Sequence, residues 1–150
     1  MYRKGVSAII LNNKNEILIV NLQSFEEKYF AIPGGGLDKG ETLKQAVFRE
    51  ISEELGIEEE SLKLVSKSKK PLRIKFKVIK LNRDGREYKG SERHFFGLKF
   101  LGKDTDIAID ENEVRMYKWV SLEKLKGYLL FDNQLQETKD MIFELFPSLR

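Results

Sequence analysis

Residues 33–57 read PGGGLDKGETLKQAVFREISEELGI, and this stretch decides the interpretation of the whole chain. It begins with a turn of proline and glycines, continues without Gly or Pro from Glu41 to Leu55, and stops at Gly56. A breaker, an uninterrupted run and a final glycine are the signals of a loop that leads into a helix. Within this helix, expected from about Thr42 to Leu55, an apolar residue recurs every four positions and forms a stripe that faces a core. The stripe consists of Leu43, Val47, Ile51 and Leu55.

Three glutamates, Glu50, Glu53 and Glu54, lie beside this apolar stripe. Because helical residues are about 100° apart around the axis, the three fall within an arc of roughly 100° near the buried edge. Like charges this close repel one another, most strongly where water is excluded, so a positive partner is expected. Carboxylate oxygens suit Mg²⁺ or Mn²⁺, and the chain has no cysteine for a softer metal. The pattern indicates metal-assisted attack of water on a phosphoanhydride, and the alternative is a solvated acidic helix face.

Residues 35–57 resemble the Nudix box at each of its defining positions. The resemblance implies an α/β/α sandwich with a mixed β-sheet between helices, whereas periodicity alone indicates only a mixture of helix and strand. It also implies a hydrolase that cleaves a nucleoside diphosphate linked to another group. The metal ligands that it implies are Glu50, Glu53, Glu54 and the carbonyl of Gly34, with Glu41 as an outer-shell ligand. Arg49 would orient the glutamates by ion pairing, and Gly56 would end the helix in a left-handed conformation.

The rest of the chain adds strands and one more helix. Apolar or alternating runs predict strands at 6–11, 17–22, 29–32, 72–78, 87–101 and 114–121, and apolar spacing predicts a helix at 132–146. With 150 residues, 41% of them hydrophobic, and no linker-like run, residues 1–150 are expected to form one Nudix hydrolase domain. Neither a transmembrane stretch nor a signal peptide is recognisable. Together with the lack of cysteine, this predicts a cytoplasmic protein without a membrane partner.

Positive charge is concentrated in residues 61–100, which hold thirteen Lys and Arg against three acidic residues. Within this segment, residues 72–78 alternate between apolar and basic, so Arg73, Lys75 and Lys77 project from one face of a strand. A solvated strand face produces the same pattern. Next to an acidic metal helix, however, a basic face is also where a polyphosphate or an RNA 5′ end would be held. We therefore expect these residues to bind substrate.

Two more substrate contacts are expected from resemblance. Gly90–Phe96 resembles a segment of the Nudix branch that contains RNA pyrophosphohydrolases and some dinucleoside polyphosphate hydrolases. That branch has glutamines where Ser91 and Arg93 stand and tryptophan where Phe95 stands, and Arg93 is the candidate contact here. Phe30 stands where the family often has tryptophan, so its ring is a candidate for stacking on a base. A place in the core is the simpler interpretation of Phe30.

A later acidic residue is expected to join the site. In related members, an acid six residues before the equivalent of Trp119 supplies a metal ligand or the general base. That residue is Glu113 in this chain, and Glu111 is the second choice. A merely soluble acidic loop is the alternative interpretation of both.

The predicted reaction is divalent-metal-dependent hydrolysis, in which Glu50 or Glu113 takes the proton from water, with Glu53 and Arg49 completing the catalytic set. The favoured substrate is a dinucleoside polyphosphate or the 5′ triphosphate of RNA. An enzymatic alternative is hydrolysis of nucleoside triphosphates or ADP-ribose. A different class of function is a catalytically silent Nudix-fold domain that binds nucleotide or RNA. Monomer and homodimer are both open.

Overall fold

The computed structural model describes residues 1–81 and 87–150, with the side chains of residues 76–81 left out. The strands are β1 (Tyr2–Leu11), β2 (Ile17–Leu22), β3 (Gly34–Gly36), β4 (Leu62–Lys67), β5 (Leu72–Leu81), β6 (Glu87–Phe100) and β7 (Val114–Val120). The α-helices are α1 (Leu43–Leu55) and α2 (Gln134–Leu145), and short 3₁₀ segments occur at Glu59–Ser61, Asp104–Asp106, Leu122–Gly127 and Pro147–Leu149. The predicted elements are therefore present, except for the strand at 29–32.

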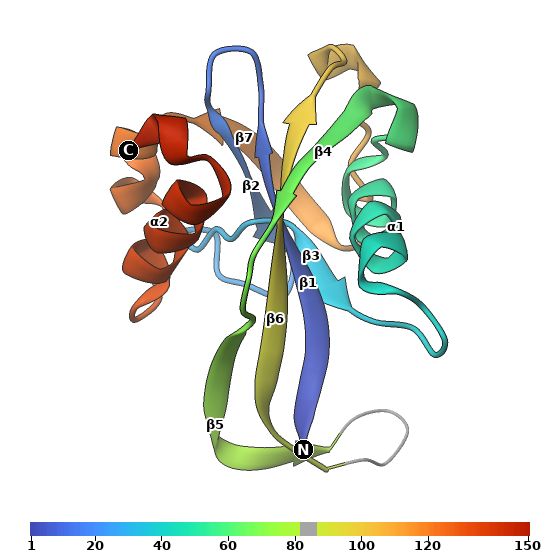
Figure 1. Ribbon diagram of the computed structural model, residues 1–150, viewed down its shortest axis with the longest axis vertical. Helices are drawn as coiled ribbons and strands as arrows, with labels where there is room; N and C mark the ends of the chain where they lie inside the picture. Colours follow the sequence, from blue (N-terminus) through green and yellow to red (C-terminus); the bar gives the residue numbers. More distant parts are fainter. Residues whose placement is uncertain (82–86) are drawn as a thin grey trace.

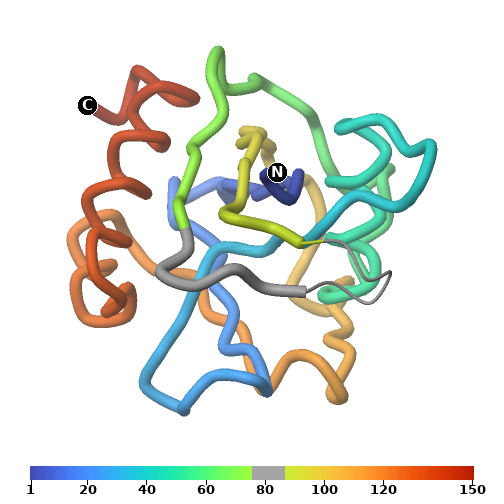
Figure 2. Tube along the Cα trace, turned by 90° about the horizontal axis from the view of Figure 1, so that it is seen from below, coloured from blue at the N-terminus to red at the C-terminus, as the bar shows by residue number. Residues whose placement is uncertain are grey.

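A mixed β-sheet runs through the centre of the molecule in the order β4–β6–β1–β2–β7. In addition, β3 pairs with β1 and β5 pairs with β6. β1 and β6 are parallel, whereas the other pairs are antiparallel. The helices α1 and α2 lie on opposite faces of this sheet, as Figure 1 and Figure 2 show from two directions. The predicted α/β/α sandwich with a mixed sheet is confirmed.

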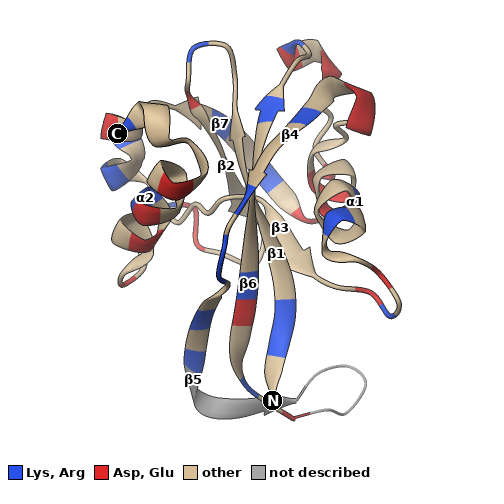
Figure 3. Cartoon of the chain, viewed as in Figure 1, with Lys and Arg blue, Asp and Glu red and all other residues tan. Residues whose placement is uncertain are grey.

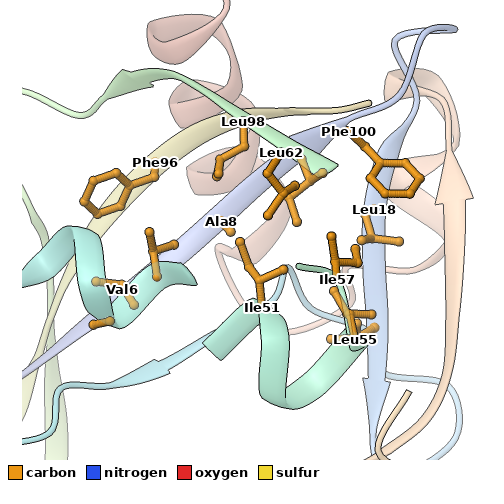
Figure 4. Close-up of a cluster of buried hydrophobic side chains, with 14 of the residues drawn as sticks. Val6, Ala8, Leu18, Ile51, Leu55, Ile57, Leu62, Phe96, Leu98 and Phe100 are labelled. Atoms are coloured by element: carbon orange, nitrogen blue, oxygen red, sulfur yellow. The ribbon is translucent and has the colours of Figure 1, made fainter. Parts of the chain in front are cut away.

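β1 is apolar along most of its length because it contributes to two cores. Val6, Ala8 and Ile10 pack with the apolar stripe of α1 (Figure 4). The alternate residues Ile9 and Leu11 belong to the core on the other face, where α2 packs. Each fully buried aliphatic side chain contributes about 1.5–3 kcal/mol to folding. Burial on both faces thus fixes β1, and with it the strands that pair with β1, between the helices.

Helix α1 begins and ends where its local sequence predicts. Thr42 is the N-cap and forms a capping box with Gln45, because each side chain accepts a hydrogen bond from the backbone N–H of the other residue. Gly56 follows the helix with a φ of 64°. A Cβ on Gly56 would lie 2.5 Å from the carbonyl oxygen of Ala108, so both the conformation and the space require glycine. The predicted left-handed end of the helix is confirmed.

The predicted strand at 29–32 is wrong. Ala31 alone pairs with Val20, in an isolated bridge. The carbonyl of Pro33 then accepts a hydrogen bond from the N–H of Ala8 at 2.8 Å, and β3 continues along β1. The chain therefore changes partner from β2 to β1 after Ala31, so it forms no continuous ladder at 29–32. This crossing brings the glycine loop against β1.

The lower part of the sheet, formed by β5 and the first halves of β1 and β6, extends beyond both helices (Figure 1). In the part of the chain that the structure describes, neither helix is long and apolar enough to cross a membrane.

Candidate active site

Arg49 on α1 is the centre of the acidic cluster. Its guanidinium binds Glu41 with two nitrogens, Nε at 2.6 Å from Oε2 and Nη2 at 2.9 Å from Oε1. Nη1 donates to Glu50 at 3.0 Å and to Glu53 at 3.1 Å, while Nη2 also donates to the carbonyl of Gly36 at 2.8 Å. These contacts, above all the one with Glu41, raise the pKa of Arg49. Arg49 therefore holds two glutamates of the helix and fastens the glycine loop to α1.

Glycine at position 35 leaves room for the carboxylate of Glu50. A Cβ on Gly35 would lie 2.3 Å from Cδ of Glu50 and 2.4 and 2.5 Å from its two oxygens. Burial raises the pKa of Glu50 and the charges of Glu53 and Glu113 raise it further, whereas Arg49 lowers it. A half-buried carboxylate surrounded by negative charge is the environment expected of a cation site.

Glu54 is buried and faces the start of the same loop. Its side chain accepts a hydrogen bond from the N–H of Gly34 at 3.0 Å. Burial raises the pKa of Glu54 to about 8 and the charge of Glu50 adds to this, whereas the hydrogen bond from Gly34 and the charge of Arg93 oppose it. A carboxylate that is buried with so little compensation favours the binding of a proton or a metal cation.

Glu113 lies near these glutamates despite its distance in the sequence. Its charge raises the pKa of both Glu50 and Glu54. Its backbone carbonyl accepts a hydrogen bond from the N–H of Gln23 at 2.8 Å, just before β7 begins. The carbonyl of Glu111 accepts a hydrogen bond from the side chain of Gln23 at 3.1 Å, and the charge of Glu111 contributes to neither of those pKa shifts. The geometry therefore favours Glu113 over Glu111 as the later acid of the site.

The donor atoms around the glycine loop fit a hard divalent cation, because they are all oxygens. Glu50, Glu53 and Glu54 offer carboxylates on adjoining turns of α1. In this structure Arg49 donates hydrogen bonds to Glu50 and Glu53. Within residues 1–81 and 87–150, no three acidic side chains are close enough together to hold a metal ion. Metal binding would require Glu53 to turn from Arg49, which its side-chain exposure of 52% allows.

Arg93 and Arg3 place positive charge beside the glycine loop. Nη1 of Arg93 donates to the carbonyl of Val6 at 2.9 Å. Burial lowers the pKa of Arg93 and the charge of Arg3 lowers it further, whereas the nearby glutamates raise it. Arg3 approaches the loop at Gly36, where an added Cβ would lie 2.8 Å from Nη2 of Arg3. The two cations and the acidic cluster thus meet at one loop, an arrangement that suits a polyphosphate held together with a metal.

A cavity of about 350 Å³ connects the acidic cluster to an aromatic surface. Gly34, Glu54 and Arg93 line one part of it. The apolar part of its lining includes Leu22, Phe25, Ile32, Leu72, Ile74, Phe95 and Phe131. A concave, mostly apolar space of this size with a few polar groups is typical of a small-molecule site. Arg93 is the one predicted substrate contact that lines this cavity in the described part of the chain.

Arg73 and Lys75 of β5 do not face this cavity. Leu72 and Ile74 line it, and strand alternation turns Arg73 and Lys75 to the opposite face. Arg73 is bound there by Glu92 of β6, with Nε and Nη2 at 3.1 and 2.9 Å from Oε1. Figure 3 marks basic residues as blue bands along β5 and β1 in the lower part of the sheet. Arg73 and Lys75 therefore do not line this cavity, and the solvated-face interpretation fits them better; their binding of substrate elsewhere stays a prediction.

Two other expected contacts have different outcomes. The side chain of Lys77 lies outside the described residues. Phe30 is only 4% exposed and packs in the core on the α2 face, with its ring 5.2 Å from that of Tyr128 at 81°. Its ring is therefore not open to a base, which corrects the stacking expectation and supports the core interpretation.

Asn21 and Arg115 hold the loop at 23–29, and sequence reasoning missed them. Asn21 is fully buried, and its Nδ2 donates to the carbonyl of Tyr29 at 2.6 Å and to those of Glu26 and Glu27 at 3.3 Å each. Arg115 donates to Oδ1 of Asn21 and to the carbonyl of Phe25. A lone asparagine in the otherwise apolar β2 was the signal that such a clamp was present.

Comparison with curated proteins finds relatives along nearly the whole chain. The RNA pyrophosphohydrolase of Orientia tsutsugamushi (strain Boryong) is 34% identical over 149 residues, which cover 97% of this chain and 91% of that protein. The RNA pyrophosphohydrolase of Zymomonas mobilis is 32% identical over 132 residues, covering 86% and 85%.

Solved structures share the fold. A C. elegans Ap4A hydrolase superposes with a TM-score of 0.68 at 21% identity, covering 93% of this chain and 97% of that one. The E. coli dihydroneopterin triphosphate pyrophosphohydrolase gives a TM-score of 0.71 at 17% identity, covering 95% of this chain and 98% of that one.

The family model of the NUDIX domain matches residues 1–144, which is nearly the whole chain. Because that match includes the loop and helix that meet at Arg49, the chain belongs to the Nudix family.

Proposed function

We propose that this protein is a divalent-metal-dependent pyrophosphohydrolase that acts on the 5′ triphosphate of RNA. The observation that carries the proposal is the shared cavity, in which Gly34, Glu54 and Arg93 lie with apolar and aromatic residues. The same cavity therefore offers polar groups for the phosphates and apolar surface for a nucleoside. The names of the relatives from Orientia tsutsugamushi and Zymomonas mobilis support RNA as the substrate. In this reaction water adds to the triphosphate, and pyrophosphate and a 5′-monophosphorylated RNA leave.

Glu50, Glu53 and Glu54 are the proposed metal-binding side chains, with the carbonyl of Gly34 as a further ligand and Glu41 in the outer shell. Bound Mg²⁺ or Mn²⁺ would supply neutralisation of the phosphate oxygens and a lower pKa of the attacking water. Arg49 orients the carboxylates of Glu50 and Glu53, and through Glu41 it fixes the approach of the glycine loop.

Arg93 and Arg3 are proposed to bind the phosphate chain from the side opposite the carboxylates. A guanidinium has five donors, and the hydrogen bond from Arg93 to the carbonyl of Val6 uses one of them. Within residues 1–81 and 87–150 no other hydrogen bond engages this largely buried guanidinium, and its further donors favour an anionic partner. Glu50 or Glu113 takes the proton from the attacking water, because both lie in the cluster, where the charge of Glu113 contributes to the raised pKa of Glu50.

Dinucleoside polyphosphates are the second candidate substrates. They offer the same phosphate chain and a base at each end, and the Gly90–Phe96 segment resembles both kinds of enzyme. A cytoplasmic location belongs to the same proposal, because a chain without cysteine suits a reducing compartment. Monomer and homodimer remain alternatives that light scattering on a sizing column distinguishes.

The test is product analysis by mass after incubation with Mg²⁺ and, in parallel, triphosphorylated RNA, diadenosine tetraphosphate, nucleoside triphosphates and ADP-ribose. Release of pyrophosphate from RNA at the highest kcat/KM is expected, and the Glu53→Gln variant should lose turnover by about a thousandfold or more while keeping its fold. Preference for mononucleotides or ADP-ribose would reject the RNA substrate and retain the chemistry. Binding without turnover, unaffected by Glu53→Gln, would instead identify a silent nucleotide-binding domain.

A further inference from the structure

One face of α2 lines the end of the cavity that lies away from the acidic cluster. Gln134, Glu137 and Thr138 contribute to the lining, and their i, i+3 and i+4 spacing puts them on a single helix face. Asp132, just before the helix, adds an exposed carboxylate at the rim. These polar groups line the same cavity as Arg93, so a ligand with its phosphates near Arg93 would extend toward them.

The side-chain amide of Gln134 already forms hydrogen bonds within the protein. Its Nε2 donates to the carbonyl of Phe30 at 2.8 Å, and its Oε1 accepts a hydrogen bond from the N–H of Phe131 at 3.1 Å. Its amide therefore fixes the wall of the cavity and has its main partners within the chain. Thr138 is buried and offers only a short hydroxyl. Glu137 is the side chain of this face that retains a full set of acceptor positions.

Glu137 is half-buried. Burial raises its pKa, and the charge of Asp140 raises it further; among the described residues no basic group acts on it. A carboxylate in such a place is a strong hydrogen-bond acceptor whose partner must come from the ligand. The one charged side chain that acts on it among the described residues is an acid, so a ligand with N–H donors satisfies it and a ligand with exposed lone pairs does not.

Aromatic rings stand at the same end of the cavity. Phe131 is 41% exposed and stacks on Tyr29, with ring centroids 4.3 Å apart and planes 11° apart. Phe25 meets Phe131 edge-on, at 5.2 Å and 74°. Phe25 and Phe131 both line the cavity. Flat aromatic surface beside an uncompensated acceptor is the combination that binds a nucleobase by its face and its edge.

We propose that Glu137 is a specificity-determining residue that selects guanine, by accepting hydrogen bonds from N1–H and the 2-amino group together. This inference rests on the proposed nucleotide substrate. Guanine presents those two donors side by side, which matches the two oxygens of a carboxylate. Adenine and cytosine each present one amino group beside a ring nitrogen lone pair, which the carboxylate repels. Uracil has one N–H between two carbonyl oxygens. Only guanine satisfies both oxygens without a clash of lone pairs.

The test compares substrates in which every base is the same, so that the base entering the cavity is known. These are diguanosine and diadenosine tetraphosphate, and the triphosphorylated dinucleotides pppGpG and pppApA. The wild-type protein is expected to prefer the guanine member of each pair by about tenfold or more in kcat/KM. The Glu137→Gln and Glu137→Ala variants should reduce that ratio to within about twofold. Because a ratio is measured, a uniform loss of active protein leaves it unchanged.

The matched control is Asp132→Asn, which removes an exposed carboxylate from the rim of the same cavity and should keep the guanine preference. No preference in the wild type, an unchanged ratio in both Glu137 variants, or a loss of preference in Asp132→Asn alone would overturn the assignment. If the wild type hydrolyses none of the four substrates, the proposed function has failed. Calorimetry then measures the dissociation constants of GTP and ATP for the wild type and for Glu137→Gln. The ratio of the two constants in each protein decides the base preference.

Discussion

Oε1 of Glu54 accepts a hydrogen bond from the backbone N–H of Gly34 at 3.0 Å, and this contact joins the end of α1 to the glycine loop. One hydrogen bond does not compensate for burial, which raises the pKa of Glu54 from 4.5 to about 8. Below about pH 4.5 the carboxyl is protonated in both the folded and the unfolded chain. As the pH rises from 4.5 to 8 the unfolded chain releases this proton and the folded chain retains it, so folding becomes less favourable.

The metal-free protein is therefore expected to lose stability between about pH 4.5 and 8 through Glu54, by up to roughly 4 kcal/mol. Urea unfolding in EDTA, with the wild type and Glu54→Gln compared at each pH, isolates this contribution. The variant should be the more stable protein at about pH 8, and Mg²⁺ should stabilise the wild type preferentially. The same pH slope in both proteins would contradict the buried, uncompensated carboxylate.

A second prediction concerns Gly35→Ala. The added Cβ would lie 2.3 Å from Cδ of Glu50, so the carboxylate must move. A displacement of this size is expected to lower kcat by about a hundredfold and to weaken metal binding, while the unfolding midpoint changes little. Gly127→Ala is the matched control, because a Cβ on Gly127 meets nothing within 4 Å. Full activity of Gly35→Ala with normal Mg²⁺ affinity would show that Glu50 is not held against the loop during the reaction.

A third prediction concerns Arg49→Lys. An ammonium group keeps the charge but cannot hold Glu41, Glu50, Glu53 and the carbonyl of Gly36 together, as the guanidinium does. We expect kcat to fall by about a hundredfold and the free energy of unfolding by about 1–3 kcal/mol. Kinetics and denaturant unfolding measure the two effects. Lys44→Ala, on the exposed side of the same helix, should change neither, and an Arg49→Lys enzyme within about threefold of the wild type would refute the role of the guanidinium.

The features that local sequence controls were predictable. The start of α1 at Thr42 and its end at Gly56 depend on capping chemistry within a few residues, and both are as expected. The alternation predicted for β5 was also correct for residues 72–75, whose side chains the structure describes, because it is a property of the backbone. What the alternation could not show is which face meets the cavity. That depends on the pairing of β5 with β6, which places Arg73 opposite Glu92.

Features that depend on distant pairing were not predictable from pattern. Arg3 meets Arg93 because β1 and β6 are parallel and in a register that places Arg3 opposite Ser91. The residues that line the cavity come from several elements, among them β1, β5, β6 and α2, so no single stretch of the sequence predicts it. Phe30 shows the remaining ambiguity, since an aromatic residue before a glycine loop has the same sequence whether it packs inward or stacks on a base.

The clamp between Asn21 and Arg115 yields the last prediction. Asn21→Ala removes the hydrogen bonds that hold the loop at 23–29, which contacts the backbone of Glu113. This loop carries Phe25, which lines the cavity, and Tyr29, which stacks on Phe131 of the cavity lining. A looser loop should raise KM by about tenfold, and lost buried hydrogen bonds should lower the free energy of unfolding by about 2–4 kcal/mol.

Asn12→Ala is the control that separates these two effects. The side chain of Asn12 also binds backbone groups, by accepting hydrogen bonds from the N–H groups of Lys14 and Glu16, but in a turn that does not line this cavity. The Asn12→Ala substitution should lower the free energy of unfolding and leave KM unchanged. If Asn21→Ala lowers stability with an unaltered KM, the loop does not shape the substrate site. A raised KM in Asn21→Ala alone shows that the buried amide acts on substrate binding through the position of the aromatic wall.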